Sequence, residues 1–253
     1  MMEIIGRGFL AGHLRTLAAE HPDAVALAAG VSWASGTSAA DFQREVDLLH
    51  RVMDDCRASG RTLIFFSTAS AGVYGPDRPG REDEPVEPRS SYGAHKLGME
   101  QAVRESGVDH LVLRLGHLIG PGQPAHQMLP TLLRALRGGQ VTVQRAATRD
   151  VIDVAHVVDV IDLLLRRGVR GETVNVATGS SVPAERIVDH LELRLAVSAT
   201  RQYQDAGTAH RVSVDKLHRL LPEVREFGFG PDYYRAALDS CLARMRDGEG
   251  TAP

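Results

Sequence analysis

The stretch that decides the fold stands near the start of the chain and reads Ile4-Ile5-Gly6-Arg7-Gly8-Phe9-Leu10-Ala11. An apolar pair is followed by a GxGxxA pattern that leads into a helical period. The first glycine allows a tight turn, the second lets the backbone approach a pyrophosphate, and the alanine permits close packing of helix on strand. The stretch therefore predicts a strand–turn–helix unit of the kind that binds dinucleotides, with a purely structural turn as the alternative.

Short apolar runs and helical periods alternate beyond this turn. The predicted strands are Ala24–Gly30, Arg61–Ser67, His110–Gly116, Val141–Gln144 and Glu172–Ala177. The predicted helices are Phe9–Glu20, Asp41–Ala58, Tyr92–Ser106, Gln127–Arg137, Val157–Arg167, Pro183–Arg194 and a last one that ends near Met245. Repeated strand–helix–strand units predict a parallel sheet covered by helices. The pattern becomes mixed after about residue 117 without a separating linker, which indicates a second lobe packed on the first.

The composition is that of an ordinary globular protein, with 253 residues, 43% of them hydrophobic and 24% charged, and a net charge of −3. The chain has no long basic run, which argues against a nucleic-acid or anionic-membrane partner. No run approaches the roughly 20 apolar residues that span a membrane. Cys56 and Cys241 give neither a disulfide framework nor a metal-binding spacing, so we expect buried thiols, no metal and a cytoplasmic location.

Tyr92 and Lys96 carry the clearest chemical signal. Residues four apart share one face of a helix, so the phenol and the ammonium can address one point. A nearby lysine favours phenolate, lowers the pKa of the tyrosine and makes it a proton donor or acceptor. Lys96 is one of only two lysines, so the pair is unlikely to arise by chance, although an incidental pair on an exposed face is the alternative. Upstream, a predicted strand ends in the hydroxyl residues Ser67, Thr68 and Ser70, which can orient a carbonyl oxygen or bond their own backbone.

Further motifs stand in order along the chain: STASAGVYG (67–75), YGAHK (92–96), LVLRLGHLIGPGQ (111–123), TRDVIDVAHVVDVI (148–161), GETVNVATGSSVP (171–183) and HRVSVDKL (210–217). Together with the glycine turn they resemble the extended short-chain dehydrogenase/reductase family of NAD-dependent epimerases and dehydratases. The resemblance implies an α/β fold with a Rossmann-like, doubly wound parallel sheet over residues 1–117 plus segments of 141–177. It also implies a smaller substrate-binding lobe made mainly of residues 118–253.

The resemblance assigns a role to each matching residue. Tyr92 would be the general acid or base, Lys96 would bind the nicotinamide ribose and lower the pKa of Tyr92, and Ser70 would hydrogen-bond the substrate carbonyl. The other assignments are contacts with NAD(H) or NADP(H) at Gly6, Arg7, Gly8, Phe9, Leu10, Ala11, Ala28, Ala29 and Lys96, and substrate contacts at Thr68, His117, Arg149 and Arg211. A plain structural role is the alternative for His117 and for both arginines.

One departure from the family pattern concerns the cofactor. Ala28 and Ala29 match an alanine pair that relatives carry later, so about 30 residues, one strand–crossover–strand unit, are missing after the first helix. That unit normally supplies the acidic residue that binds the adenosine ribose, and Asp23 precedes a strand instead of ending one. Arg7 can pair with a 2′-phosphate, which favours NADP(H), or can be an exposed turn residue.

The resemblance implies NAD(P)H-dependent reduction, or epimerisation, of a keto group, expected at C4, on a nucleotide-activated deoxysugar. Dehydration is disfavoured because Ala69, Ala71 and Gly72 surround Ser70 in place of the acidic pair that water elimination needs. The missing unit leaves open a cofactor-free isomerase, lyase or cyclase that uses Tyr92. A non-catalytic binding protein is the third alternative. We also expect a homodimer formed through the helices at 41–58 and 92–106, and a lid or packing role for Trp33.

Overall fold

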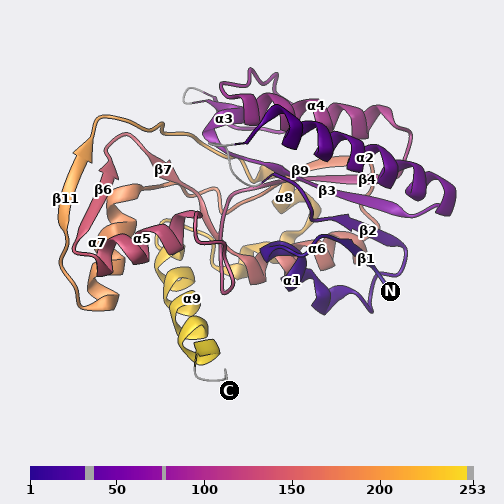
Figure 1. The fold of residues 1–253 in the computed structure, drawn as a ribbon. Helices are drawn as coiled ribbons and strands as arrows, with labels where there is room; N and C mark the ends of the chain where they lie inside the picture. The colour runs from indigo at the N-terminus through magenta and orange to yellow at the C-terminus, as the bar shows by residue number, and fades with distance from the viewer. Residues whose placement is uncertain (32–36, 76–77, 250–253) are drawn as a thin grey trace.

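The computed structural model describes residues 1–31, 37–75 and 78–249, so the expectation for Trp33 lies outside the described residues. Within them, the central sheet holds five parallel strands in the order β1-β2-β3-β4-β9 (Figure 1). Their bounds are β1 Glu3–Ile5, β2 Ala24–Leu27, β3 Thr62–Thr68, β4 His110–Leu115 and β9 Glu172–Val176. The inner strands are continuous apolar runs, as expected for a parallel sheet covered on both faces.

Helices cover the two faces of this sheet. α2 (Ala39–Ser59) and α4 (Ser91–Glu105) lie on one face, whereas α1 (Phe9–Leu14) and α6 (Val154–Arg166) lie on the other (Figure 1). Side chains alternate across a strand, so Val25 and Leu27 of β2 pack toward α2, while Ala26 packs toward α6. The predicted α/β class with a Rossmann-like sheet is confirmed.

The path of the chain at the edge of the sheet shows where the missing unit belongs. β1 pairs directly with β2, with Ile5 opposite Leu27, and is an edge strand among the described residues. The connections β1–α1–β2 and β2–α2–β3 advance in the same direction but pass over opposite faces, so they have opposite hands. About 98% of such connections are right-handed. The described strands therefore extend to one side of β1 only, and the partners that a complete fold places on its other side are missing.

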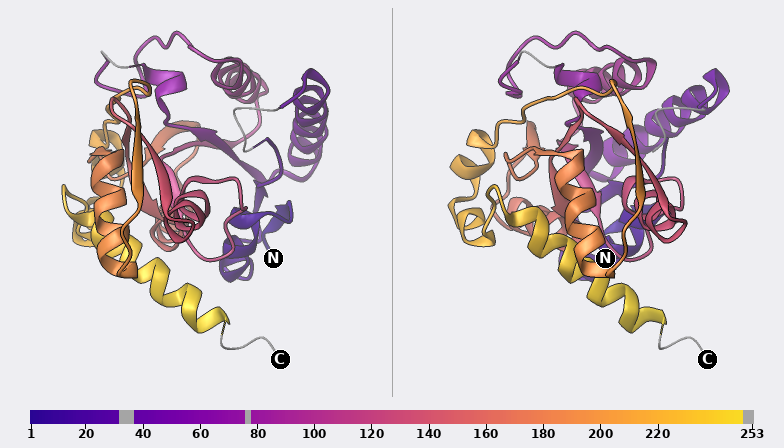
Figure 2. Two further views of the ribbon diagram at one scale, coloured as in Figure 1. Left: turned by 60° about the vertical axis from the view of Figure 1, so that its left-hand side comes forward. Right: turned by 90° about the vertical axis from the view of Figure 1, so that its left-hand side faces the viewer.

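The second lobe is built from strand pairs and helices that follow β4 (Figure 2). The pairs are β5 (His117–Ile119) with β8 (Val151–Asp153), β6 (Gln140–Gln144) with β11 (Thr200–Gln204), and β7 (Thr148–Arg149) with β10 (Val182–Pro183). The helices are α5 (Met128–Arg137), α7 (Ala184–Leu195) and α9 (Tyr233–Glu249), and shorter ones are α3 (Ala71–Tyr74) and α8 (Asp215–Leu220). Residues 141–177 are divided between the lobes, because β6 pairs within the second lobe whereas α6 and β9 pack in the central sheet.

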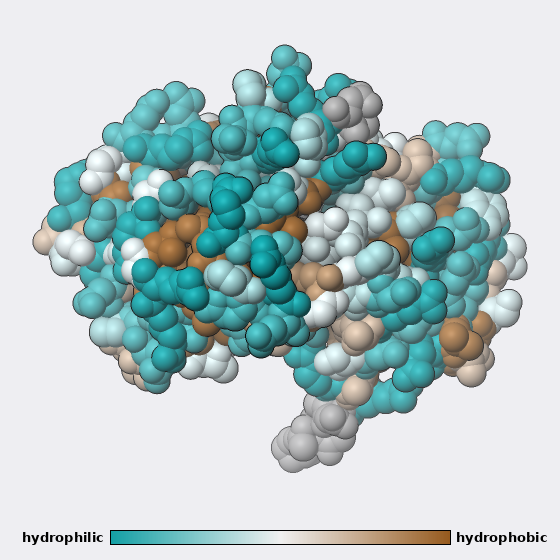
Figure 3. Space-filling model, turned by 180° about the vertical axis from the view of Figure 1, so that it is seen from behind, coloured by the Kyte–Doolittle hydropathy of each residue, from teal (hydrophilic) through white to brown (hydrophobic). Residues whose placement is uncertain are grey.

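Ser38 caps α2 through a capping box with Asp41. Cys56 and Cys241 are buried free thiols, as the sequence predicts. None of the helices in the described ranges combines the length and apolar character needed to cross a membrane. The face seen from behind is mostly hydrophilic, with apolar side chains gathered in limited patches (Figure 3).

Candidate active site

The predicted site residues gather at one edge of the sheet. The glycine turn follows β1, Ala28 and Ala29 follow β2, Thr68 ends β3, and His117 follows β4. The carboxyl ends of parallel strands meet at the same edge, which is where ligands bind in open α/β sheets. The folding of the sheet alone therefore assembles residues that are more than 100 positions apart.

The glycine turn has the shape that a pyrophosphate requires. Gly6 has a φ of +143°, and a Cβ there would lie 2.6 Å from the carbonyl oxygen of Ala28, so glycine is required. Gly8 precedes α1 with extended backbone, and a Cβ there would meet nothing within 4 Å, so the space beside it is open. Ala11 is fully buried, as close packing of helix on strand requires.

Beside the two glycines, a ligand would meet backbone atoms more than side chains. A Cβ on Gly120 would lie 3.0 Å from the ring of Phe9, so that ring lies close to the Gly120 backbone, and Leu10 packs against the core. Arg7 is exposed. These residues fit the pyrophosphate of a dinucleotide. The structure offers fewer groups to the adenosine end of the cofactor. Asp23 lies before β2, so it is at the opposite end of the strands from the glycine turn.

Lys96 is buried, with 5% of its surface exposed, and its ammonium is held by other residues. Nζ donates to Oε1 of Glu45 at 2.7 Å and to the carbonyl oxygen of Phe66 at 3.4 Å. It lies 5.9 Å from the centre of the Tyr92 ring. Since an ammonium has three N–H groups, one remains for a ribose hydroxyl, so the residues present fit the nicotinamide end of the cofactor.

Glu45 is a site residue that the sequence reading missed. It is 4% exposed, and Oε2 accepts from Nε2 of His95 at 2.9 Å. Burial raises the pKa of Glu45, but the Lys96 charge and the hydrogen bonds hold it below its ordinary value. Gly30, with a φ of +148°, lets the carboxylate approach, because a Cβ there would collide with it. The available signal was a charged residue four positions before the buried Leu49, on the apolar face of α2.

The expectation that Lys96 lowers the pKa of Tyr92 is wrong. Burial, followed by the negative charge of Glu45, raises the pKa of Tyr92 to about 12. Lys96 does not offset this, because its charge is paired with Glu45. In the structure Tyr92 is therefore a phenol at neutral pH.

The hydroxyl residues at the end of β3 divide into two roles. Ser67 is buried and donates to Oε1 of Glu100 at 2.5 Å, so it belongs to the core. The Ser70 carbonyl accepts from the N–H groups of Val73 and Tyr74 and thereby starts α3. Ser70 and Thr68 are half-buried, and both remain candidates to contact a substrate carbonyl.

Arg149 is the centre of a second cluster. Its guanidinium is half-buried, donates to the carbonyl oxygen of Thr148 at 2.8 Å, and has no carboxylate partner among the described residues. The rings of His117 and His210 lie 6.1 Å apart. Burial, followed by the charge of Arg149, lowers the pKa of His117 to about 3 and that of His210 to about 4. The cluster is thus one cation flanked by two neutral imidazoles.

His210 was not predicted, and it connects this cluster to the catalytic end of the site. It is 3% exposed, and neither ring nitrogen completes a well-formed hydrogen bond within the described part of the chain. It lies against the backbone of Ala69, next to Ser70. Arg211 is exposed, so His210 and not Arg211 faces Arg149.

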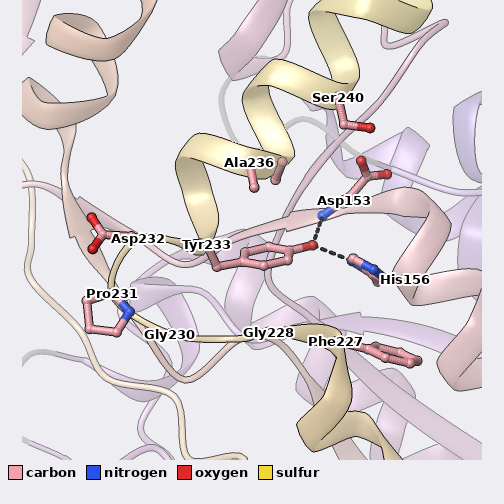
Figure 4. A pocket seen from close by; sticks show the side chains of 11 residues that line it. Asp153, His156, Phe227, Gly228, Gly230, Pro231, Asp232, Tyr233, Ala236 and Ser240 are labelled. Atoms are coloured by element: carbon pink, nitrogen blue, oxygen red, sulfur yellow. Dashed lines mark hydrogen bonds between the residues drawn. The ribbon is translucent and has the colours of Figure 1, made fainter.

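A further hollow of about 580 Å³ lies between the start of α6 and α9 (Figure 4). The Tyr233 hydroxyl is at its centre, where it accepts from the backbone N–H of Asp153 at 3.2 Å and bonds Nδ1 of His156 at 2.6 Å. Tyr92, Lys96 and Ser70 do not line it. These bonds join α9 to α6, so we assign them a structural role.

Comparisons with known proteins identify the family and the fold of the chain. The sequence model of the NAD dependent epimerase/dehydratase family matches residues 11–177. A dTDP-6-deoxy-L-talose 4-dehydrogenase (NAD(P)(+)) from Kitasatospora kifunensis is 31% identical, over 92% of this chain and 77% of that protein. The structure of RMD from Pseudomonas aeruginosa complexed with NADPH has a TM-score of 0.75 at 22% identity, over 96% of this chain and 99% of the other. MoeE5 in complex with UDP-glucuronic acid and NAD has a TM-score of 0.69 at 25% identity, over 86% and 78%.

Proposed function

The chain belongs to the NAD-dependent epimerase/dehydratase family and is an enzyme of the short-chain dehydrogenase/reductase type, and from this premise we propose that it reduces a keto group, at C4, on a nucleotide-activated deoxysugar. The main support for this proposal is that the candidate site has a cationic end and a phenolic end. Arg149, a cation without a carboxylate partner in the part of the chain that the structure describes, suits the diphosphate, and Tyr92, a largely buried phenol, suits the carbonyl. His210 beside Ala69 connects the two ends.

When bound against Gly6–Ala11 and Lys96, NAD(P)H would supply the hydride that the carbonyl carbon receives. Tyr92 donates its Oη proton to the carbonyl oxygen, which becomes the hydroxyl of the product, and the phenolate is reprotonated from water. Ser70 orients the carbonyl by donating a hydrogen bond to its oxygen, with Thr68 as the alternative donor. Arg149 binds the diphosphate, and the half-buried imidazole of His117 and the buried imidazole of His210 offer neutral hydrogen-bond partners to the sugar or phosphate.

The cofactor would be held in this proposal by residues that follow two strand ends and by Lys96 on α4. The backbone at Gly6–Ala11 would bind the pyrophosphate, the chain at Ala28 and Ala29 would contact the cofactor, and Lys96 would donate to the nicotinamide ribose. Arg7, exposed beside the turn, would pair with a 2′-phosphate. We therefore propose NADP(H) before NAD(H).

Absorbance at 340 nm tests the reaction. Wild-type protein mixed with NADPH and a dTDP-4-keto-6-deoxy sugar should consume NADPH, and Tyr92→Phe should slow this by about 100-fold or more, because general-acid catalysis contributes about that much. Absence of turnover by the wild type with dTDP- and UDP-linked 4-keto sugars, or undiminished turnover by Tyr92→Phe, refutes the proposal.

The missing strand unit favours a second candidate, a cofactor-free enzyme that uses Tyr92 as acid and base for an isomerisation, elimination or ring closure. Calorimetric titration with NADH and NADPH distinguishes the two. Micromolar binding of either supports the reductase. No binding of either, together with activity in the absence of dinucleotide, supports the second candidate. The homodimer through α2 and α4 and the cytoplasmic location stay predictions, and sedimentation equilibrium tests the dimer.

A further inference from the structure

The backbone of His210 holds this residue beside Arg149. The His210 N–H donates to Oγ1 of Thr148 at 3.2 Å, and Thr148 directly precedes Arg149. Gly207, with a φ of +96°, lets the chain come this close, because a Cβ there would lie 2.6 Å from the Cβ of Ala147. The fold therefore brings a second basic side chain to the cation of the candidate site.

The imidazole of His210 is enclosed by the protein but not satisfied by it. It is 3% exposed, and neither ring nitrogen completes a well-formed hydrogen bond among the described residues. The Ala69 carbonyl at the end of β3 faces the ring as an acceptor. Within the described ranges, Arg149 of β7 is the charged group that acts on the ring, and His117 of β5 is its titratable neighbour. Two unsatisfied buried nitrogens are costly unless a ligand bonds to them.

A diphosphate bound to Arg149 would change the state that suits this ring. A neutral imidazole has one N–H, so it can donate to the Ala69 carbonyl or to a phosphate oxygen, but not to both. A protonated imidazole donates to both. In the free protein, burial and then the charge of Arg149 lower the pKa of His210 to about 4. Two negative charges beside Arg149 offset its repulsion and raise the pKa of His210 toward neutrality.

We propose that His210 takes up a proton when the nucleotide diphosphate binds and thereby becomes the second cation of the diphosphate site. This role rests on the proposed function, which supplies the diphosphate. The proton comes from solvent, forms an N–H bond on the ring, and returns to solvent when the product leaves. Two cations then face the two negative charges of the diphosphate, so the site favours a diphosphate diester over an uncharged sugar.

Calorimetric titration with dTDP-glucose measures this proton directly. Both phosphates of dTDP-glucose are esterified, so the ligand itself does not titrate between pH 6 and pH 8. Titrations at pH 6 in Mes and in Bis-Tris, whose ionisation enthalpies differ, give the number of protons taken up. The wild type should take up about one proton at pH 6 and should bind about tenfold more tightly at pH 6 than at pH 8. Binding without proton uptake at pH 6 overturns the inference and leaves the proposed function standing.

Three variants assign the proton to one residue. His210→Gln keeps a hydrogen-bonding side chain but cannot be protonated, so proton uptake should be lost. Its affinity for dTDP-glucose should be about tenfold below that of the wild type at pH 6 and almost equal at pH 8. His117→Gln should retain the uptake, and His50→Gln, on an exposed part of α2, should match the wild type.

Two results with these variants overturn the inference. One is proton uptake that persists in His210→Gln, and the other is an equal loss of affinity at both pH values, which a merely structural role would give. Uptake of a proton by a protein that reduces no keto sugar would support the role of His210 and count against the proposed reduction. Binding of neither dTDP-glucose nor UDP-glucose by the wild type would contradict both.

Discussion

Arg149 is costly to the folded protein unless an anion binds it. A half-buried guanidinium with no carboxylate partner among the described residues loses hydration that two neutral hydrogen bonds, to the Thr148 carbonyl and at 3.5 Å to Oε1 of Gln144, do not restore. Burial accordingly lowers the pKa of Arg149 below its ordinary value. Sites that give up stability in this way are expected where a ligand later supplies the missing charge.

Replacement of this side chain should separate binding from stability. Arg149→Met should weaken binding of dTDP by about 30-fold, because hydrogen bonds to charged groups contribute about 2 kcal/mol, and should leave stability equal or higher. Calorimetry and urea unfolding measure the two effects. Arg145→Met, an exposed arginine four positions earlier that stacks over Tyr203, is the control and should bind dTDP normally. Undiminished dTDP binding by Arg149→Met would contradict the diphosphate assignment.

His210 makes stability depend on pH with a definite sign. Its pKa is lowered from 6.5 to about 4, so the unfolded chain binds more protons than the folded one below pH 6.5. Stability should be full above about pH 7 and should fall as the pH drops toward 4, with His210 accounting for about 3 kcal/mol of the loss.

His210→Gln should reduce this acid loss, and the urea midpoint measured from pH 7 to pH 4.5 shows it as a smaller slope. His50→Gln, on an exposed part of α2, should retain the wild-type slope. Identical slopes for His210→Gln and the wild type would show that the imidazole is already charged in the folded protein.

At the scale of single residues, the sequence points to candidates that belong to short motifs and misses those that distant segments contribute. Tyr92, Lys96 and Ser70 could be proposed as site residues because each belongs to a local pattern. Glu45 and His210 reach the site from separate elements, and nothing in their own neighbourhood marks a ligand. The pKa of Tyr92 was mispredicted for the same reason, since the partner of Lys96 comes from another helix.

At the scale of elements, the turn between β1 and α1 holds two glycines with different roles: Gly6 for the backbone shape and Gly8 for contact with the ligand. Gly6→Ala should destabilise the protein by at least about 2 kcal/mol, because the positive φ is strained and the new Cβ meets the Ala28 carbonyl. Gly8→Ala should fold normally, since its Cβ meets nothing, yet bind NADPH about tenfold more weakly if the pyrophosphate occupies that space.

Gly12→Ala is the matched control, because its Cβ also meets nothing and it lies farther along α1. It should leave NADPH affinity unchanged, and fluorescence titration compares all three variants. Equal affinity in Gly8→Ala and Gly12→Ala would place the pyrophosphate elsewhere.

The elements that the sequence predicted well are those with a buried face. α2, α5 and α6 carry apolar residues at helical spacing, and their observed bounds lie within about three residues of the predicted ones. β11 was missed because Thr200–Gln204 is polar and mostly exposed, so alternation gives no signal. The helix predicted to Glu20 ends early, as a 3-10 turn at Arg15–Leu17 brings the chain back toward β2.

At the scale of the whole molecule, the described strands of the central sheet lie on one side of β1 only, and this limits how the cofactor can be held. Within the described residues β1 is the edge, so there is no strand beyond it to support an adenosine. Reduced nicotinamide mononucleotide should therefore bind within about tenfold of NADH, because an adenosine half without the 2′-phosphate that Arg7 is proposed to contact adds little. Competition titration measures both affinities. Binding of NADH more than about 100-fold tighter than the mononucleotide would show that the adenosine half has its own site.

The two crossovers of opposite hand have a practical consequence. α1 stays on the same face of the sheet when a strand–crossover–strand unit is removed after it. The missing unit therefore belongs in the connection between Ala18 and Ala24. A donor block of one such unit, inserted there, re-establishes right-handed winding on both sides of β1 and pairs its open edge. A nucleotide-binding unit could therefore be inserted at this one position, which would change the nucleotide specificity while the second lobe and its substrate stay unchanged.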